Sequence, residues 1–367
     1  MHLIASDQKW DSIRRIPYST PGRWVHELNL SELVLHSRAD ANTVDALLTK
    51  LFPLLPCLSR LELTLSMQLS RRAMQSLGCR DGAENLRVLR GVKYDNTVTN
   101  SVGHDEERDP LTELIACSTG LEELEIIGLG MDDLDVMIAS NNAHSSAKGP
   151  HVPQLSLPRL HTLTLLSTPS SHFLRRLLRV PLPKLRTLVI TPYGDLPPPL
   201  SLVTAFLEVH GQSLRTLVLH TPKAAWPSVL MSYPPPKSLL RLLPNLTALS
   251  LEGTSLAREG EEPFRLEVPP LPSSPHSPYA HAPRGHPLAT LWVPRPTSAL
   301  RESIFPALPY LPNLREVRCL EVRWAKRGMS ARALEAGFQG QMQEWARLLG
   351  QRKIRLLDAD GRERTTV

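Results

Sequence analysis

The feature that most constrains the fold of this chain is a short leucine phrase that returns along almost its whole length. The phrase has the form L-x-x-L-x-L, as in Leu58 to Leu63 and Leu214 to Leu219. Its copies begin, at quasi-regular spacing, at Val25, Leu58, Leu86, Leu121, Leu160, Leu185, Leu214, Leu246, Leu288 and Leu314. One such phrase would mean little in a leucine-rich chain, but a series of them predicts a structural unit that repeats.

The spacing within the phrase predicts a strand, because alternate side chains of a strand point to opposite faces. Leu61 and Leu63 then point inward, while Arg60 and Glu62 point outward and Leu58 closes the core at the bend into the strand. One unit cannot bury its apolar face alone, so neighbouring units stack and their strands pair in parallel. The pattern therefore predicts an α/β fold: a leucine-rich-repeat solenoid, or horseshoe, of about ten irregular repeats, with a parallel concave sheet and helices on the convex side.

Helical spacing appears between the phrases, where the return limb of each repeat is expected. Val44, Leu47, Leu48 and Leu51 fall at i, i+3, i+4 and i+7, which places them on one face of a helix. Two further sets follow a similar spacing: Leu202, Phe206 and Val209, and Leu300, Ile304 and Leu308. Each set is expected to cover the sheet, and prolines such as Pro53 end the helices before the next strand.

The domain organisation follows from where the phrases start and stop. We expect a lead-in or cap over residues 1–24, the solenoid over 25–329 and a capping helix with a tail over 330–367. Polar, small and proline-rich residues fill two long insertions, about 139–157 and 257–287, which we expect to be flexible because such composition buries little apolar area.

A helix from Ser330, as N-cap, to Lys353 is the clearest isolated helix in the chain. We expect it to cover the last repeat, since a solenoid needs a closing element. A partner-binding helix is the alternative. Its apolar stripe consists of Leu334, Phe338, Met342, Trp345 and Leu349.

Composition and charge limit the classes of function. Hydrophobic residues make up 41% of the chain and charged residues 21%, and 42 basic side chains against 36 acidic ones give a formal charge of +6. No run of five like charges occurs, so we expect a mixed solvated surface and not a nucleic-acid stripe. We find no secretory signal and no apolar stretch long enough to span a membrane, which predicts a cytoplasmic or nuclear protein.

The cysteines and histidines do not form a recognisable metal pattern. Cys57, Cys79, Cys117 and Cys319 lie far apart without a C-x-x-C pair, so we expect buried free thiols of a reducing compartment. A second group, in a proline-rich loop without fixed geometry, consists of His276, His281 and His286. We expect no metal site there.

No phosphate-loop, dinucleotide-binding, zinc-protease or nucleophile-elbow motif occurs, so we expect no enzyme, no catalytic residue and no cofactor. One acidic run suggests acid–base chemistry as an alternative, but a solvated strip on the outward face of a strand explains it better. That run comprises Glu122, Glu123, Glu125, Asp132, Asp133 and Asp135.

The outward strand positions form the candidate binding surface. The first third of this predicted concave face is charged, and its middle is neutral and rich in threonine. Curved sheets of this kind bind extended partners through many shallow contacts, so we expect a protein partner there and a monomeric chain. The one large aromatic side chain on this face is Trp292. Packing of Trp292 under the neighbouring proline-rich insertion is as good an interpretation as exposure for partner binding. The candidate protein-binding residues are Arg60, Glu62, Arg90, Glu123, Glu125, Thr162, Thr164, Thr187, Thr216, Trp292 and Arg318.

With these repeats and the lead-in from Trp10 to Leu28, the chain resembles the leucine-rich-repeat part of fungal F-box proteins of the ribonuclease-inhibitor-like kind. In that family an N-terminal F-box docks on an adaptor of a cullin ubiquitin ligase, and the repeats recruit the substrate. The resemblance implies that this chain is the substrate-recognition part of such a receptor. The F-box itself is missing before Trp10, so an adaptor contact is expected only if an F-box lies upstream.

Two other functions remain as alternatives: a basic leucine-rich-repeat scaffold that associates with nucleic acid, and a leucine-rich-repeat binder unrelated to ubiquitination. The chain also departs from regular repeats of this class, which carry an asparagine after the strand. We therefore expect irregular convex turns. The residues at the equivalent place are Ser66, Thr168, Tyr193, Pro222 and Thr254.

Overall fold

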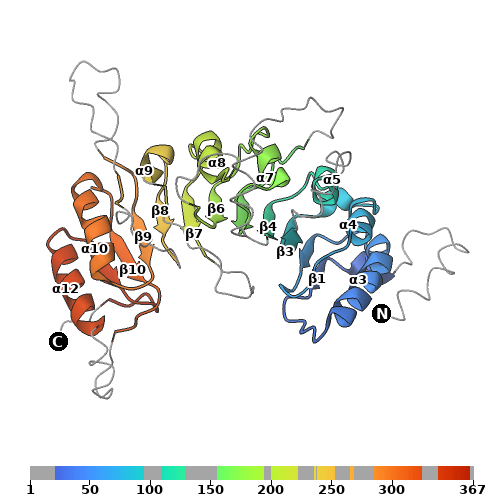
Figure 1. Cartoon of the computed structure of the whole chain (residues 1–367), viewed down its shortest axis with the longest axis horizontal. Helices are drawn as coiled ribbons and strands as arrows, with labels where there is room; N and C mark the ends of the chain where they lie inside the picture. The colour runs from blue at the N-terminus through green and yellow to red at the C-terminus, as the bar shows by residue number, and fades with distance from the viewer. Residues whose placement is uncertain are drawn as a thin grey trace, which may run out of the picture. The chain divides into compact units, whose positions relative to one another are not determined.

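Short parallel strands alternate with helices along the chain (Figure 1). The computed structural model describes residues 21–94, 109–128, 155–193, 200–221, 235–236, 238–252, 265–267, 285–324 and 338–363. Contacts divide the chain into two compact units, Met1–Leu185 and Arg186–Val367.

The first unit contains both strands and helices in alternation. Its strands are β1 (Glu27–Asn29), β2 (Arg60–Glu62), β3 (Val88–Tyr94), β4 (Glu123–Gly128) and β5 (Thr162–Leu166). Its α-helices are α3 (Arg38–Leu51), α4 (Arg71–Gly78), α5 (Pro110–Cys117) and α7 (His172–Leu177). Short 3-10 helices are η1 (Pro21–Trp24), η2 (Phe52–Leu54) and η3 (Ala83–Asn85).

The second unit repeats this alternation. Its strands are β6 (Thr187–Ile190), β7 (Thr216–Leu219), β8 (Ala248–Ser250), β9 (Thr290–Val293), β10 (Glu316–Cys319) and β11 (Arg355–Leu357). Its α-helices are α8 (Val203–His210), α9 (Leu239–Leu242), α10 (Ser298–Ile304) and α12 (Phe338–Gly350), and η5 (Phe305–Tyr310) is a 3-10 helix.

Within each unit the strands pair in parallel and follow one another in chain order. Each copy of the leucine phrase contains one strand, and the middle residue of the phrase lies in register from strand to strand. The first unit aligns Leu28, Leu61, Leu89, Leu124 and Leu163. The second aligns Leu188, Leu217, Leu249, Leu291 and Val317, and Leu356 of β11 continues this row. The predicted α/β fold with a parallel sheet is confirmed.

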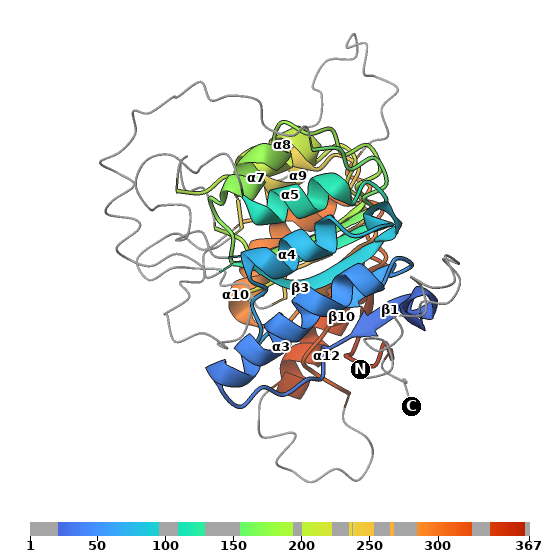
Figure 2. The same ribbon diagram turned by 90° about the vertical axis from the view of Figure 1, so that its right-hand side faces the viewer.

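The core of each unit lies between the sheet and the helices on one of its faces. Helices α3, α4 and α5 lie side by side over the strands of the first unit (Figure 2). Central leucines such as Leu61 and Leu217 are fully buried, and so is Leu58 at the bend into its strand. Because a strand buries only alternate residues, the same strands present their other side chains on the opposite face.

Polar side chains fix where several helices begin. Ser37 caps α3 in a reciprocal arrangement with Asp40, and Asp109 accepts the N–H groups of Leu111 and Thr112 at the start of α5. Such caps satisfy N–H groups that have no partner within the helix. The caps therefore fix the residues at which α3 and α5 begin.

Two residues expected on buried helix faces are exposed instead. Leu47 is 44% exposed and Val209 is 55% exposed. In α8 the buried stripe consists of Val203, Phe206, Leu207 and His210, so it is rotated away from Val209. The prediction for these two positions is wrong because regular apolar spacing does not determine which flank of a short helix meets the sheet.

The C-terminal segment contains a strand that sequence analysis missed. Helix α12 ends at Gly350 and not at the expected Lys353, which has a positive φ of 61°. The chain then adds β11 in parallel to β10. Met342, Trp345 and Leu349 of the predicted stripe are buried, whereas Ser330 and Leu334 lie outside the described residues.

The four cysteines are free, but the expectation that all are buried is wrong. Only Cys319 is buried, while Cys57 is half-buried and Cys79 and Cys117 are exposed. Cys79 and Cys117 lie at the C-terminal ends of α4 and α5, where the helices leave the core.

The predicted insertions 139–157 and 257–287 fall mostly outside the described residues. Within their described parts, Leu157 and Leu266 are buried. In the part of the chain that the structure describes, no helix is both long and apolar enough to cross a bilayer.

Candidate functional site

The sheet face that points away from the helices is called the open face of each unit. All of the predicted protein-binding residues lie on strands of these two faces, and each is partly exposed. The first unit's open face carries Arg60, Glu62, Arg90, Glu123, Glu125, Thr162 and Thr164. The second unit's open face carries Thr187, Thr216, Trp292 and Arg318.

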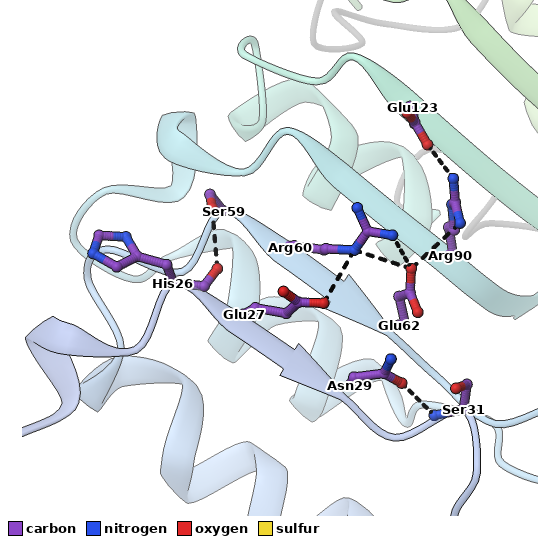
Figure 3. Close-up of polar contacts among 9 residues, drawn as sticks. All are labelled: His26, Glu27, Asn29, Ser31, Ser59, Arg60, Glu62, Arg90 and Glu123. Carbon is purple, nitrogen blue, oxygen red and sulfur yellow. Dashed lines mark hydrogen bonds and ion pairs between the residues drawn. The ribbon is translucent and has the colours of Figure 1, made fainter.

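Opposite charges alternate across β1 to β4 on the first open face (Figure 3). Arg60 lies between Glu27, with Nε 3.3 Å from Oε1, and Glu62, with Nη2 2.5 Å from Oε1. Arg90 lies between Glu62, at 3.4 Å, and Glu123, at 2.5 Å. These five residues, Glu27, Arg60, Glu62, Arg90 and Glu123, form a charge ladder.

The register of the strands explains the ladder. Glu27 lies directly opposite Arg60, and Glu62 lies directly opposite Arg90. Opposite charges at facing positions of a sheet contribute roughly 0.2–1 kcal/mol each. Glu27 was not among the expected binding residues, although aligning the leucine phrases places it beside Arg60.

A bulge in β3 shapes the middle of this face. The pairing of β3 with β4 shifts between Leu89 and Val92, and Gly91 has a φ of 72°. The bulge leaves Arg90 outward and turns Lys93 outward as well, so sequence alternation alone missed Lys93. Gly91 also donates its backbone N–H to the carboxylate of Glu125.

Electrostatics distinguish the carboxylates of β4. The hydrogen bond to Glu123 raises the pKa of Arg90. Burial raises the pKa of Glu125, against the opposing effects of Arg90 and the Gly91 N–H. Among the described residues no ion pair joins Glu125 to a cation. Burial lowers the pKa of Lys93.

The second open face is neutral from β6 to β9. In one row the register aligns Thr187, Thr216, Ala248 and Thr290. The neighbouring row aligns Val189, Val218, Ser250 and Trp292. This part of the face has short side chains with one large aromatic at its end, which suits shallow contacts with an extended chain.

Charge returns at β10 and β11. Arg355 donates a hydrogen bond to the Glu316 carboxylate, and Arg318 donates to the carbonyl oxygen of Ala359 at 2.6 Å. Arg318 lies beside Trp292 in the register but is held by the C-terminal turn. Most of the insertion that was considered as a cover for Trp292 lies outside the described residues.

The remaining chemistry-bearing candidates give no assembled site. His286 is buried, with Nε2 2.9 Å from the Leu243 carbonyl oxygen and Nδ1 accepting the Leu288 N–H, while His276 and His281 lie outside the described residues. In the described ranges no group of three or more His, Cys, Asp or Glu side chains could hold a metal ion. Of the acidic run, the glutamates lie within the described residues, whereas the aspartates at positions 132, 133 and 135 lie outside them.

No protein-family model matches this chain, and no curated protein matches it. What the open faces bind must therefore be inferred from their own chemistry.

Proposed function

We propose that this chain is a non-enzymatic protein-interaction module, a leucine-rich-repeat solenoid of about ten irregular repeats that binds a protein partner on its open sheet faces. The observation that carries the proposal is the alignment of the leucine phrases. Each phrase contains a parallel strand, its leucines face the helices, and its outward residues form a continuous surface within each unit.

The chemistry of that surface supports a protein partner. The charge ladder, the threonine row and Trp292 offer ion pairs, hydrogen bonds and one aromatic anchor, the contacts that protein interfaces use. Nucleic acid fits less well, since the first open face presents the carboxylates of Glu27, Glu62, Glu123 and Glu125, which repel phosphate.

We further propose, from the resemblance to fungal F-box proteins, that the partner is a substrate recruited to a ubiquitin ligase. Reading the transcript upstream of Met1 for an in-frame F-box tests the link to the ligase. Purification of the full-length product from cells should then recover a cullin and its adaptor. Absence of both the F-box and these subunits would leave a binder unrelated to ubiquitination.

Site-specific photo-crosslinking in cells tests the binding surface itself. A photoreactive amino acid replaces Thr216 on the open face of β7, and a matched variant replaces Glu208 on the exposed side of α8. The same protein should crosslink from position 216 and from a second open-face position, Thr187. Equal labelling from position 208, or no crosslink from either threonine, would contradict the proposal.

A further inference from the structure

We propose that the partner of the first open face is an extended protein segment that presents a Lys or Arg side chain to Glu125 and Glu123, lying over Thr162 and Thr164 of β5. This inference rests on the proposed binding function and specifies its chemistry. The two threonines are called the threonine shelf.

The first part of the charge ladder is already satisfied within the protein. Arg60 and Arg90 each lie between two carboxylates. The side chain of Glu62, which contacts both arginines, is only 13% exposed. A partner would therefore have to break existing ion pairs to bind at β2.

The pairing of carboxylates with arginines within the protein ends at β4. Glu123 contacts Arg90 through Oε2. Glu125 accepts the Gly91 N–H and is attracted by Arg90, but it forms no ion pair with a cation among the described residues. Half-burial deprives Glu125 of part of its hydration, which its raised pKa reflects. A cation supplied from outside would stabilise its charged form.

The neighbouring strand β5 offers no ion-pair partner to the two carboxylates among the described residues. In register, Glu123 faces Thr162 and Glu125 faces Thr164, so two short neutral side chains border the two carboxylates. On the β5 side, His161 is engaged elsewhere: its Nδ1 lies 3.0 Å from Thr162 Oγ1 and its Nε2 lies 4.0 Å from Glu122 Oε2. The aliphatic stem of a Lys or Arg can lie along the threonine methyl groups while its head reaches the carboxylates.

The chemistry selects a basic peptide over other ligands. The carboxylates repel phosphate, and in the described residues no group of three or more metal-binding side chains forms. An extended segment also suits a row of parallel strands, because alternate residues of such a segment point to the same side.

The test uses a synthetic nine-residue peptide of alternating Lys and Ser, with a Gln-Ser peptide of the same length as the neutral control. Amide spectra of the whole chain are recorded during titration at physiological salt. We expect the Lys-Ser peptide to shift amides of β4 and β5. The Glu125→Gln variant should weaken its binding by about fivefold, in the range of partly exposed ion pairs.

Glu316→Gln is the matched control, because Glu316 is a carboxylate on the open face of β10 that Arg355 already engages. The Glu316→Gln variant should bind the Lys-Ser peptide with the affinity of the unmodified chain. Unchanged affinity of Glu125→Gln, equal binding of the Gln-Ser peptide, or shifts confined to other strands would each overturn the inference.

The outcome is separable from that of the proposed function. Crosslinking from Thr187 and Thr216 does not depend on Glu125, which belongs to the other unit. If those crosslinks persist while Glu125→Gln has no effect, only the basic-segment inference fails.

Discussion

Gly91 lies so close to Leu63 that a Cβ built on it would be 2.3 Å from the Leu63 carbonyl oxygen. This contact between β3 and the end of β2 coincides with the bulge that turns Lys93 to the open face. The position also has a φ of 72°, which favours glycine. The outward position of Lys93 therefore depends on the glycine at position 91.

Gly91→Ala is expected to destabilise the protein by about 2 kcal/mol or more, from the strained φ together with the clash. Denaturant unfolding followed by circular dichroism measures this change. Gly340→Ala, in α12 with nothing within 4 Å of the added Cβ, is the matched control. The control should be neutral or stabilise by up to ~1 kcal/mol, and equal losses in both variants would contradict the expectation.

Leu217→Ala tests the leucine column. Leu217 is fully buried in register with Leu188 and Leu249, so truncation removes apolar contacts and leaves a cavity. We expect a loss of about 2–5 kcal/mol in the free energy of unfolding. Val218→Ala, the next residue on the open face, should cost less than about 1 kcal/mol. Comparable losses at both positions would contradict the assignment of inward and outward faces.

His286 should make stability depend on pH. Burial lowers its pKa from 6.5, and its Nδ1 accepts the Leu288 N–H, so protonation would place two donors against each other. The unfolded chain binds this proton more readily, so the stabilisation is present above pH 6.5 and is lost as the pH falls toward the lowered folded value.

Denaturant unfolding at pH 7.5 and at pH 5 measures this dependence. His286→Gln should be less stable than the unmodified chain at the higher pH and should lose less stability on acidification. Parallel pH profiles for the two proteins would show that His286 does not contribute.

Thiol labelling should separate the cysteines. Cys79 and Cys117 are exposed and should react with iodoacetamide in the native protein, with Cys117 slowed because partial desolvation of its thiol raises its pKa. Cys319 is buried, and burial raises its pKa to about 12, so little thiolate forms near neutral pH. Mass spectrometry of the labelled sites should detect Cys319 modification only after unfolding. Native labelling of Cys319 at the rate of Cys79 would contradict its buried position.

Much of the candidate surface could be predicted from alternation along each strand. Arg60 and Glu62 flank Leu61, so burying the leucine necessarily exposes the charges. Lys93 could not be placed this way, because the bulge at Gly91 shifts the alternation by one residue. The pairing of Glu27 with Arg60 could be predicted by aligning the leucine phrases, because the strands pair with Leu28 opposite Leu61.

By itself, the sequence determined the parallel strands and their inward leucines, because the spacing of apolar residues within one phrase is a local property. Only the tertiary structure decided which flank of α8 is buried, leaving Val209 exposed, since that depends on how the helix meets the sheet. It also revealed β11, where Lys353 and Asp358 stand at the register positions of phrase leucines. β11 forms although its sequence lacks two of the three phrase leucines, because it pairs with β10 and buries Leu356. Such contacts between distant segments produce no local sequence pattern.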